Sequence, residues 1–129
     1  MQNSALKSLS NQTLENHLLE IQKAQANLKG VTLKTGLIYS DVFSNESGNS
    51  VYIKPENLQI TGAFKLRGAY NKLCSLTPSE RKRGVIASSA GNHAQGVAYS
   101  AQKLGILATI VMPKKIGRAS CRERVYGEC

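Results

Sequence analysis

The sequence predicts an α/β fold, an open parallel sheet built from βαβ units in which a helix joins two neighbouring strands. Between residues 84 and 112 an apolar run, a helical pattern and a second apolar run follow one another. A length of about thirty residues is usual for a βαβ unit. Both apolar runs, 85–87 and 106–112, lack polar alternation, which indicates strands buried on both faces of a parallel sheet.

The N-terminal part of the chain predicts one long helix. Residues 1–12 are polar and are expected to form a flexible leader. Thr13 can cap a helix that runs to about Leu28, and Gly30 stands where a glycine usually ends a helix. Apolar residues at helical spacing predict one core-packing face, made of Leu14, Leu18, Ile21 and Leu28.

The middle of the chain predicts extended and irregular structure before the next helix. Residues 31–40 mix β-branched residues with Thr and Gly, so we expect an extended segment. Residues 41–50 are rich in Ser, Asn and Gly and are expected to form a loop. A short strand is predicted at 51–54, where Pro55 ends it, and a helix at about 64–74.

Two further helices are predicted from their end signals. Thr77 and Glu80 form a capping-box pattern at the start of a short helix, which Gly84 ends. Residues 92–104 form the helix of the βαβ unit, and Gly105 is its terminator.

Charge and cysteine content narrow the class of protein. The formal charge is +9, which would suit a nucleic-acid partner. The only tight basic cluster is 81–83 and no aromatic ladder accompanies it, so we interpret it as a solvated face and expect no nucleic-acid partner. A basic nucleic-acid-binding module remains an alternative.

The cysteines and apolar runs indicate the compartment. Cys74, Cys121 and Cys129 form neither a disulfide framework nor a metal-ligand spacing, so a reducing cytoplasm and no metal site are expected. No secretory signal is visible and no apolar run reaches the roughly 20 residues of a membrane helix, so no membrane association is expected.

Lys65 is the first candidate for chemistry. A Schiff base with a carbonyl cofactor needs an amine that is uncharged part of the time, which an apolar wall and nearby cations favour. Phe64 adjoins Lys65 and Arg67 lies two residues on, while Gly62 and Gly68 allow close approach. Taken alone, this segment is better explained as a surface lysine on an amphipathic helix.

The loop after the strand at 84–89 is the second candidate, because it lies at the carboxyl edge of the sheet, where α/β folds bind ligands. A helix N-terminus behind small residues binds anions. Asn92 suits a phenolate oxygen, and Ser88, Ser89 and Gln95 can hydrogen-bond a carboxylate. The alternative is a tight turn with Asn92 as an ordinary N-cap. His93 is assigned no acid or base role.

Together, Phe64-Lys65-Leu66-Arg67-Gly68-Ala69 and the segment 88–96 resemble the threonine dehydratase branch of the pyridoxal-phosphate enzymes with the tryptophan-synthase-β fold (fold type II). The resemblance covers roughly residues 31–114. It implies that Lys65 forms the Schiff base with pyridoxal 5'-phosphate, that Phe64 lies against the pyridine ring, and that Asn92 contacts the 3-oxygen. It also implies a loop around the substrate carboxylate, made of Ser89, Ala90, Gly91 and Gln95.

The activity that the resemblance implies is α,β-elimination of L-threonine, and of L-serine, to 2-oxobutanoate or pyruvate and ammonia. Such a lyase serves amino-acid metabolism, in isoleucine biosynthesis or threonine breakdown, and a homo-oligomer is expected. Serine racemases are a similar alternative, but they carry a serine where this chain has Ala90, which favours the dehydratase.

The resemblance also implies a division of the chain. Residues 13–115 correspond to the N-terminal portion of the catalytic domain, which is incomplete here because the family's phosphate-binding loop lies further downstream. Residues 116–129 resemble translated sequencing-adapter sequence and are predicted to be a non-native tail. We therefore expect the isolated chain to be poorly stable and inactive, and a non-catalytic basic fragment is the remaining alternative.

Overall fold

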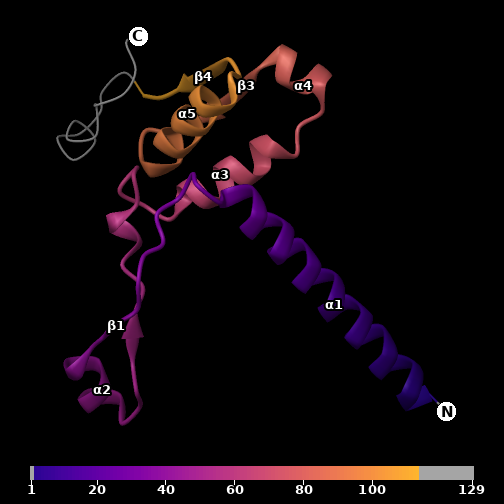
Figure 1. Ribbon diagram of the computed structural model, residues 1–129, viewed down its shortest axis with the longest axis vertical. Coiled ribbons are helices and arrows are strands. Elements are labelled where there is room, and N and C mark those ends of the chain that lie inside the picture. The colour runs from indigo at the N-terminus through magenta and orange to yellow at the C-terminus, as the bar shows by residue number, and fades with distance from the viewer. Residues whose placement is uncertain (1, 114–129) are drawn as a thin grey trace.

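The computed structural model describes the backbone of residues 2–113 and the side chains of residues 13–113. The predicted βαβ unit is confirmed (Figure 1): β3 (Val85–Ser88) and β4 (Ala108–Val111) pair in parallel, and α5 (Asn92–Leu104) joins them. Within the described part of the chain this sheet has two strands, with Val85 opposite Ala108 and Ser88 opposite Val111. The predicted tail, 116–129, lies outside the described residues.

Within the described residues one face of this sheet is covered and the other is exposed, whereas the sequence predicts burial on both faces. α5 and α3 (Lys65–Cys74) pack on the same face of the sheet, against Ala87 and Ile110. On the opposite face Ile86 is 78% exposed. The described residues place helices on one side of the sheet only. The strands therefore carry more apolar side chains than these helices cover.

The N-terminal helix, α1 (Gln2–Leu28), begins earlier than the predicted start at Thr13. Residues 2–12 contain neither Gly nor Pro, so no backbone signal stops the helix from extending into the predicted leader. Most of the expected core-packing face is exposed within the described residues, because α1 meets the rest mainly at its C-terminal end. There Asn27 Nδ2 donates to Asn71 Oδ1 at 2.9 Å, and Leu28 is half-buried.

An antiparallel pair, β1 (Ile38–Tyr39) and β2 (Tyr52–Ile53), forms an arm that extends from the helical part, with β1 and α2 (Asp41–Ser47) labelled at the lower left in Figure 1. α2 corrects the loop predicted at 41–50. Ser40 caps the helix by accepting from Phe43 N at 3.4 Å, and Gly48 ends it in the left-handed conformation. The cap residues at both ends therefore stabilise a helix in a segment whose composition favours a loop.

The next helices agree with the sequence. α3 covers almost the whole range predicted for it, and α4 (Pro78–Arg83) begins with the predicted capping box. In that box Glu80 N donates to Thr77 Oγ1 at 3.3 Å and Thr77 N donates to Glu80 Oε2 at 2.7 Å. Gly84 then enters the sheet with φ +80°, and a Cβ there would lie 2.7 Å from the Leu107 carbonyl oxygen.

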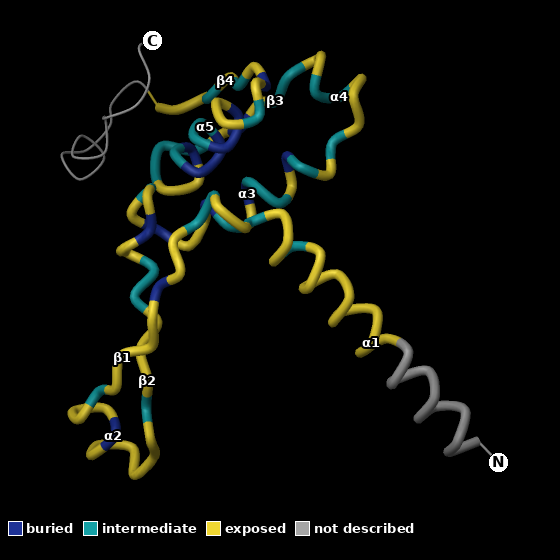
Figure 2. Tube along the Cα trace, viewed as in Figure 1, coloured by how far each residue is buried: buried dark blue, intermediate teal, exposed yellow. Residues whose placement is uncertain are grey.

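The buried hydrophobic residues gather where α3, α5 and the sheet meet (Figure 2). Leu66 is the largest fully buried hydrophobic side chain, with 0% exposure. A short 3-10 turn, η1 (Glu56–Leu58), precedes this core and leads towards α3. Among residues 2–113 no helix combines the length and apolar character that a membrane span requires.

Candidate active site

Lys65 is the first residue of α3 and its side chain is exposed. The chain reaches it through Gly62, which has φ +68° and whose N–H donates to the Gln59 carbonyl oxygen at 2.8 Å. Phe64 precedes the helix and is 63% exposed. Consecutive residues at the start of α3 therefore carry an exposed apolar ring and an exposed primary amine.

Gly96 brings the two predicted segments together. It lies in α5, and a Cβ at this position would be 3.2 Å from the Lys65 carbonyl oxygen and 3.3 Å from Leu66 N. Real Cβ atoms rarely come that close to backbone, so the absence of a side chain at 96 is what lets the two helices approach. The start of α3 thus lies directly against the first turns of α5.

This close approach predicts opposite effects for two matched glycine substitutions. Gly68, on α3, has nothing within 4 Å of an added Cβ, so Gly68→Ala should raise the free energy of unfolding by about 0.5–1 kcal/mol through helix propensity. Gly96→Ala should lose that gain or become destabilising, because overpacking costs about 1–3 kcal/mol. Urea unfolding of a full-length protein that contains residues 13–113, followed by circular dichroism, measures both effects, and equal stabilisation by the two variants would contradict the close contact.

The N-terminus of α5 has no side-chain cap. Gly91 occupies the N-cap position and Asn92 is the first helical residue, which corrects the alternative reading of Asn92 as the N-cap. The loop is held at the carboxyl edge of the sheet, since Ser89 N donates to the Val111 carbonyl oxygen at 3.0 Å and Gly91 N donates to Ser89 Oγ at 3.3 Å. Amides at an uncapped helix start, at the positive end of the helix dipole, favour a bound anion.

The other predicted site residues lie in or beside this loop. Ala90 is half-buried, as are Ser89, Gly91 and Gln95, whereas the Asn92 side chain is exposed. His93 is also exposed, in the first turn of α5. Among the residues with described side chains, no cluster of His, Cys, Asp or Glu could hold a metal ion.

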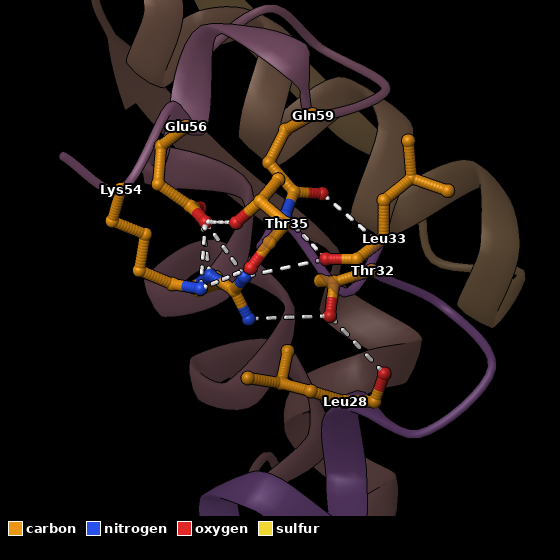
Figure 3. Close-up of polar contacts among 8 residues, drawn as sticks. Leu28, Thr32, Leu33, Thr35, Lys54, Glu56 and Gln59 are labelled. Atoms are coloured by element: carbon orange, nitrogen blue, oxygen red, sulfur yellow. Dashed lines mark hydrogen bonds and ion pairs between the residues drawn. The ribbon is translucent and has the colours of Figure 1, made fainter. Parts of the chain in front are cut away.

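A polar cluster centred on Glu56 and on Arg67 of α3 was not predicted from the sequence (Figure 3). Arg67 donates from Nε to Glu56 Oε2 at 2.7 Å and from Nη2 to Glu56 Oε1 at 2.8 Å. Thr35 Oγ1 donates to Glu56 Oε1 at 2.6 Å, and Lys54 Nζ donates to the Thr35 carbonyl oxygen at 2.7 Å. One signal could have found the cluster: Glu56 is the only acidic residue between Glu46 and Glu80.

Arg67 stabilises the ionised form of the Glu56 carboxyl. Its hydrogen bonds lower the pKa of the Glu56 carboxyl from 4.5 to about 2, against the opposing effect of burial and with help from the Thr35 hydroxyl. Because the folded pKa is depressed, the ionised carboxylate adds stability above its ordinary pKa, and this contribution is lost as pH falls towards 2. The pair is therefore intact at neutral pH.

Comparisons with known proteins agree with the resemblance in the sequence. A family described as "Pyridoxal-phosphate dependent enzyme" matches residues 28–124. The L-threonine ammonia-lyase of Thermotoga maritima is 60% identical over 97 residues, which cover 75% of this chain and 24% of the relative. The catabolic L-threonine dehydratase TdcB of Escherichia coli K12 is 50% identical over 95 residues, 74% of this chain and 29% of that relative.

Solved structures give the same picture. Threonine deaminase isoform 2 of Solanum lycopersicum superposes with a TM-score of 0.72 at 36% identity, over 84% of this chain and 30% of that one. Maize serine racemase superposes with a TM-score of 0.73 at 34% identity, over 81% of this chain and 32% of that one. The chain thus spans 24% and 29% of the length of the two curated relatives.

Proposed function

The chain belongs to the family of pyridoxal-phosphate dependent enzymes, and we propose that a full-length protein containing residues 13–113 of this sequence deaminates L-threonine. Water leaves in an α,β-elimination and is taken up again in the hydrolysis that releases ammonia. The products are 2-oxobutanoate and ammonia, and L-serine would give pyruvate. Identities of 60% and 50% to a threonine ammonia-lyase and a threonine dehydratase support this substrate class.

One observation carries the proposal: the contact at Gly96 places the backbone of Lys65 against the helix whose uncapped N-terminus follows the loop 89–91. Conversion of an amino-acid substrate requires a base and a site for its carboxylate. The exposed amine can accept the proton of the substrate Cα, and the helix start can bind the substrate carboxylate.

The described residues fit the cofactor that the family name implies. Lys65 offers the amine that holds the cofactor, the exposed ring of Phe64 offers an apolar face, and Asn92 offers an amide at the start of α5. When bound, pyridoxal phosphate supplies a carbonyl group for the substrate amine and a ring that takes up negative charge. These assignments of Lys65, Phe64 and Asn92 are part of the proposal.

The residues of this chain then have three tasks. The amides at the start of α5, together with Ser89, Ala90, Gly91 and Gln95, bind and orient the substrate carboxylate. Lys65 Nζ accepts the proton from the substrate Cα. Since the carboxylate is fixed on α5 and the amine on α3, the contact between the helices determines how the Cα–H bond lies relative to Nζ.

Racemisation of serine is the second candidate, because maize serine racemase has a TM-score of 0.73 with this chain. Racemases carry a serine at the position of Ala90, and that serine works as the acid and base on the opposite face. A methyl group cannot exchange a proton, so Ala90 favours elimination.

An assay of the full-length protein with L-threonine and pyridoxal phosphate tests the proposal, and we expect 2-oxobutanoate to accumulate. With L-serine we expect pyruvate and no D-serine by chiral chromatography. The 129-residue chain alone should form no product, because it spans only 24% and 29% of the length of the relatives. D-serine as the main product would favour the racemase, and turnover by the chain alone would refute its predicted inactivity.

A further inference from the structure

The start of α3, where Lys65 lies, has no ordinary helix cap. Phe64 occupies the N-cap position and makes no side-chain hydrogen bond to the first turn. An uncapped helix start leaves backbone donors unsatisfied and tends to fray. Lys65, whose amine must lie accurately relative to the substrate, is the first residue of this turn. The turn therefore needs a restraint other than a cap.

The Glu56–Arg67 ion pair supplies such a restraint from one side. Arg67 lies two residues after Lys65, in the same first turn. Its two nitrogens contact the two Glu56 oxygens at 2.7 and 2.8 Å. A fork of two parallel hydrogen bonds fixes orientation as well as distance, which a single charge contact does not.

Glu56 can act as a fixed point because its own surroundings are held. Its side chain is 15% exposed and accepts from Thr35 Oγ1. Gln59, which is 4% exposed, clamps the neighbouring segment: its Nε2 donates to the Leu33 carbonyl oxygen at 2.7 Å and its Oε1 accepts from Leu33 N at 3.0 Å. Figure 3 shows Gln59 and Glu56 both reaching towards the segment that carries Leu33 and Thr35.

The backbone of the same turn is also held by packing. Leu66 is fully buried, and Gly96 of α5 lies against the Lys65 and Leu66 backbone. Lys65 itself is exposed, so its position follows from its two neighbours in the turn. One neighbour is fixed by packing, and the other, Arg67, is fixed by Glu56.

We propose that Glu56 and Arg67 are positioning residues for Lys65: their ion pair holds the first turn of α3 and so determines where the Lys65 amine lies. The inference rests on the proposed function, because it assigns a purpose to the accurate placement of that amine. Neither residue is given a contact with substrate or cofactor.

Glu56→Gln in the full-length protein is the main test, because it keeps the size of the side chain and removes its charge. We expect kcat for L-threonine to fall about 10- to 100-fold with little change in KM, since a small misplacement of a reacting group has effects of this order. We also expect slower borohydride fixation of pyridoxal phosphate on Lys65, measured by mass spectrometry, and a shifted pH midpoint in the absorbance of the bound cofactor.

Glu80→Gln is the matched control. Glu80 also holds a helix start through hydrogen bonds, in the capping box of α4, but it belongs to a different helix from Lys65. It should leave kcat, the fixation rate and the absorbance midpoint unchanged even where it lowers stability. If Glu56→Gln and Glu80→Gln leave these three readouts equally unaffected, the ion pair is only a structural contact and the inference is overturned.

Arg67→Lys separates the geometry of the ion pair from its charge. It is the test to use if Glu56→Gln does not fold. It keeps the positive charge but cannot make two parallel hydrogen bonds, so it should reproduce the losses expected for Glu56→Gln, and wild-type values would overturn the inference. Absence of 2-oxobutanoate from the unchanged protein, with normal fixation on Lys65, would refute the proposed function alone, and the fixation rates of the variants would still decide the inference. Fixation on no lysine would overturn both.

Discussion

Replacing Lys65 with alanine in the full-length protein is expected to abolish turnover of L-threonine. The substitution removes the amine that holds the cofactor and accepts the Cα proton, and loss of a general base alone costs roughly 10²–10⁴-fold in rate. In the absence of pyridoxal phosphate the free energy of unfolding should change by no more than about 0.5 kcal/mol, because the side chain is exposed. The measurements are product formation, retention of pyridoxal phosphate after borohydride treatment, and urea unfolding.

Lys72→Ala is the control for this experiment. Lys72 lies on the same helix, in its last turn, and its side chain is also exposed. The variant should retain full turnover and should still be labelled on Lys65. Near-normal turnover by Lys65→Ala, or labelling of a different lysine, would exclude the assigned role.

Leu66→Ala, one residue further on, should act on stability and not on the chemistry of the reaction. Leu66 has no exposed surface and packs where α3 approaches α5, so its truncation should lower the free energy of unfolding by about 2–5 kcal/mol. The loss reduces the amount of folded enzyme at elevated temperature or in urea. Equilibrium unfolding of the full-length protein measures it.

The control here is Leu19→Ala, at an exposed position of α1. Alanine is a good helix former, so this variant should stay within about 0.5 kcal/mol of the unchanged protein. A loss at Leu66 as small as the one at Leu19 would show that the side chain is not part of a cooperative core.

Local signals in the sequence predict much of the fold. The βαβ unit follows from two apolar runs with a helix between them, and the start of α4 follows from Thr77 and Glu80. α2 is missed because its Ser- and Asn-rich composition is also typical of loops, and only Ser40 and Gly48 show that it is helical. The described residues leave one sheet face open although burial on both is predicted, because apolar content reports what a strand can bury and does not show what covers it.

The candidate site is predicted in its parts but not in its assembly. The segments around Lys65 and Gly91 can be identified from residue types. Their contact depends on a close approach of two helices at Gly96, which spacing along the chain does not show. The Glu56–Arg67 pair spans 11 positions and needs a turn between its partners, so no helical or strand periodicity brings it out.

The uncovered face of the β3–β4 sheet has a consequence for how such a protein is made. Residues 13–113 leave the ribosome before any residues that follow them, with Ile86, Leu107 and Val111 exposed on strands or at their ends. Strands with such exposed apolar surface tend to aggregate with other copies of the same chain. Nascent chains of this protein should therefore need a chaperone until that face is covered, and the 129-residue chain expressed by itself should collect in inclusion bodies.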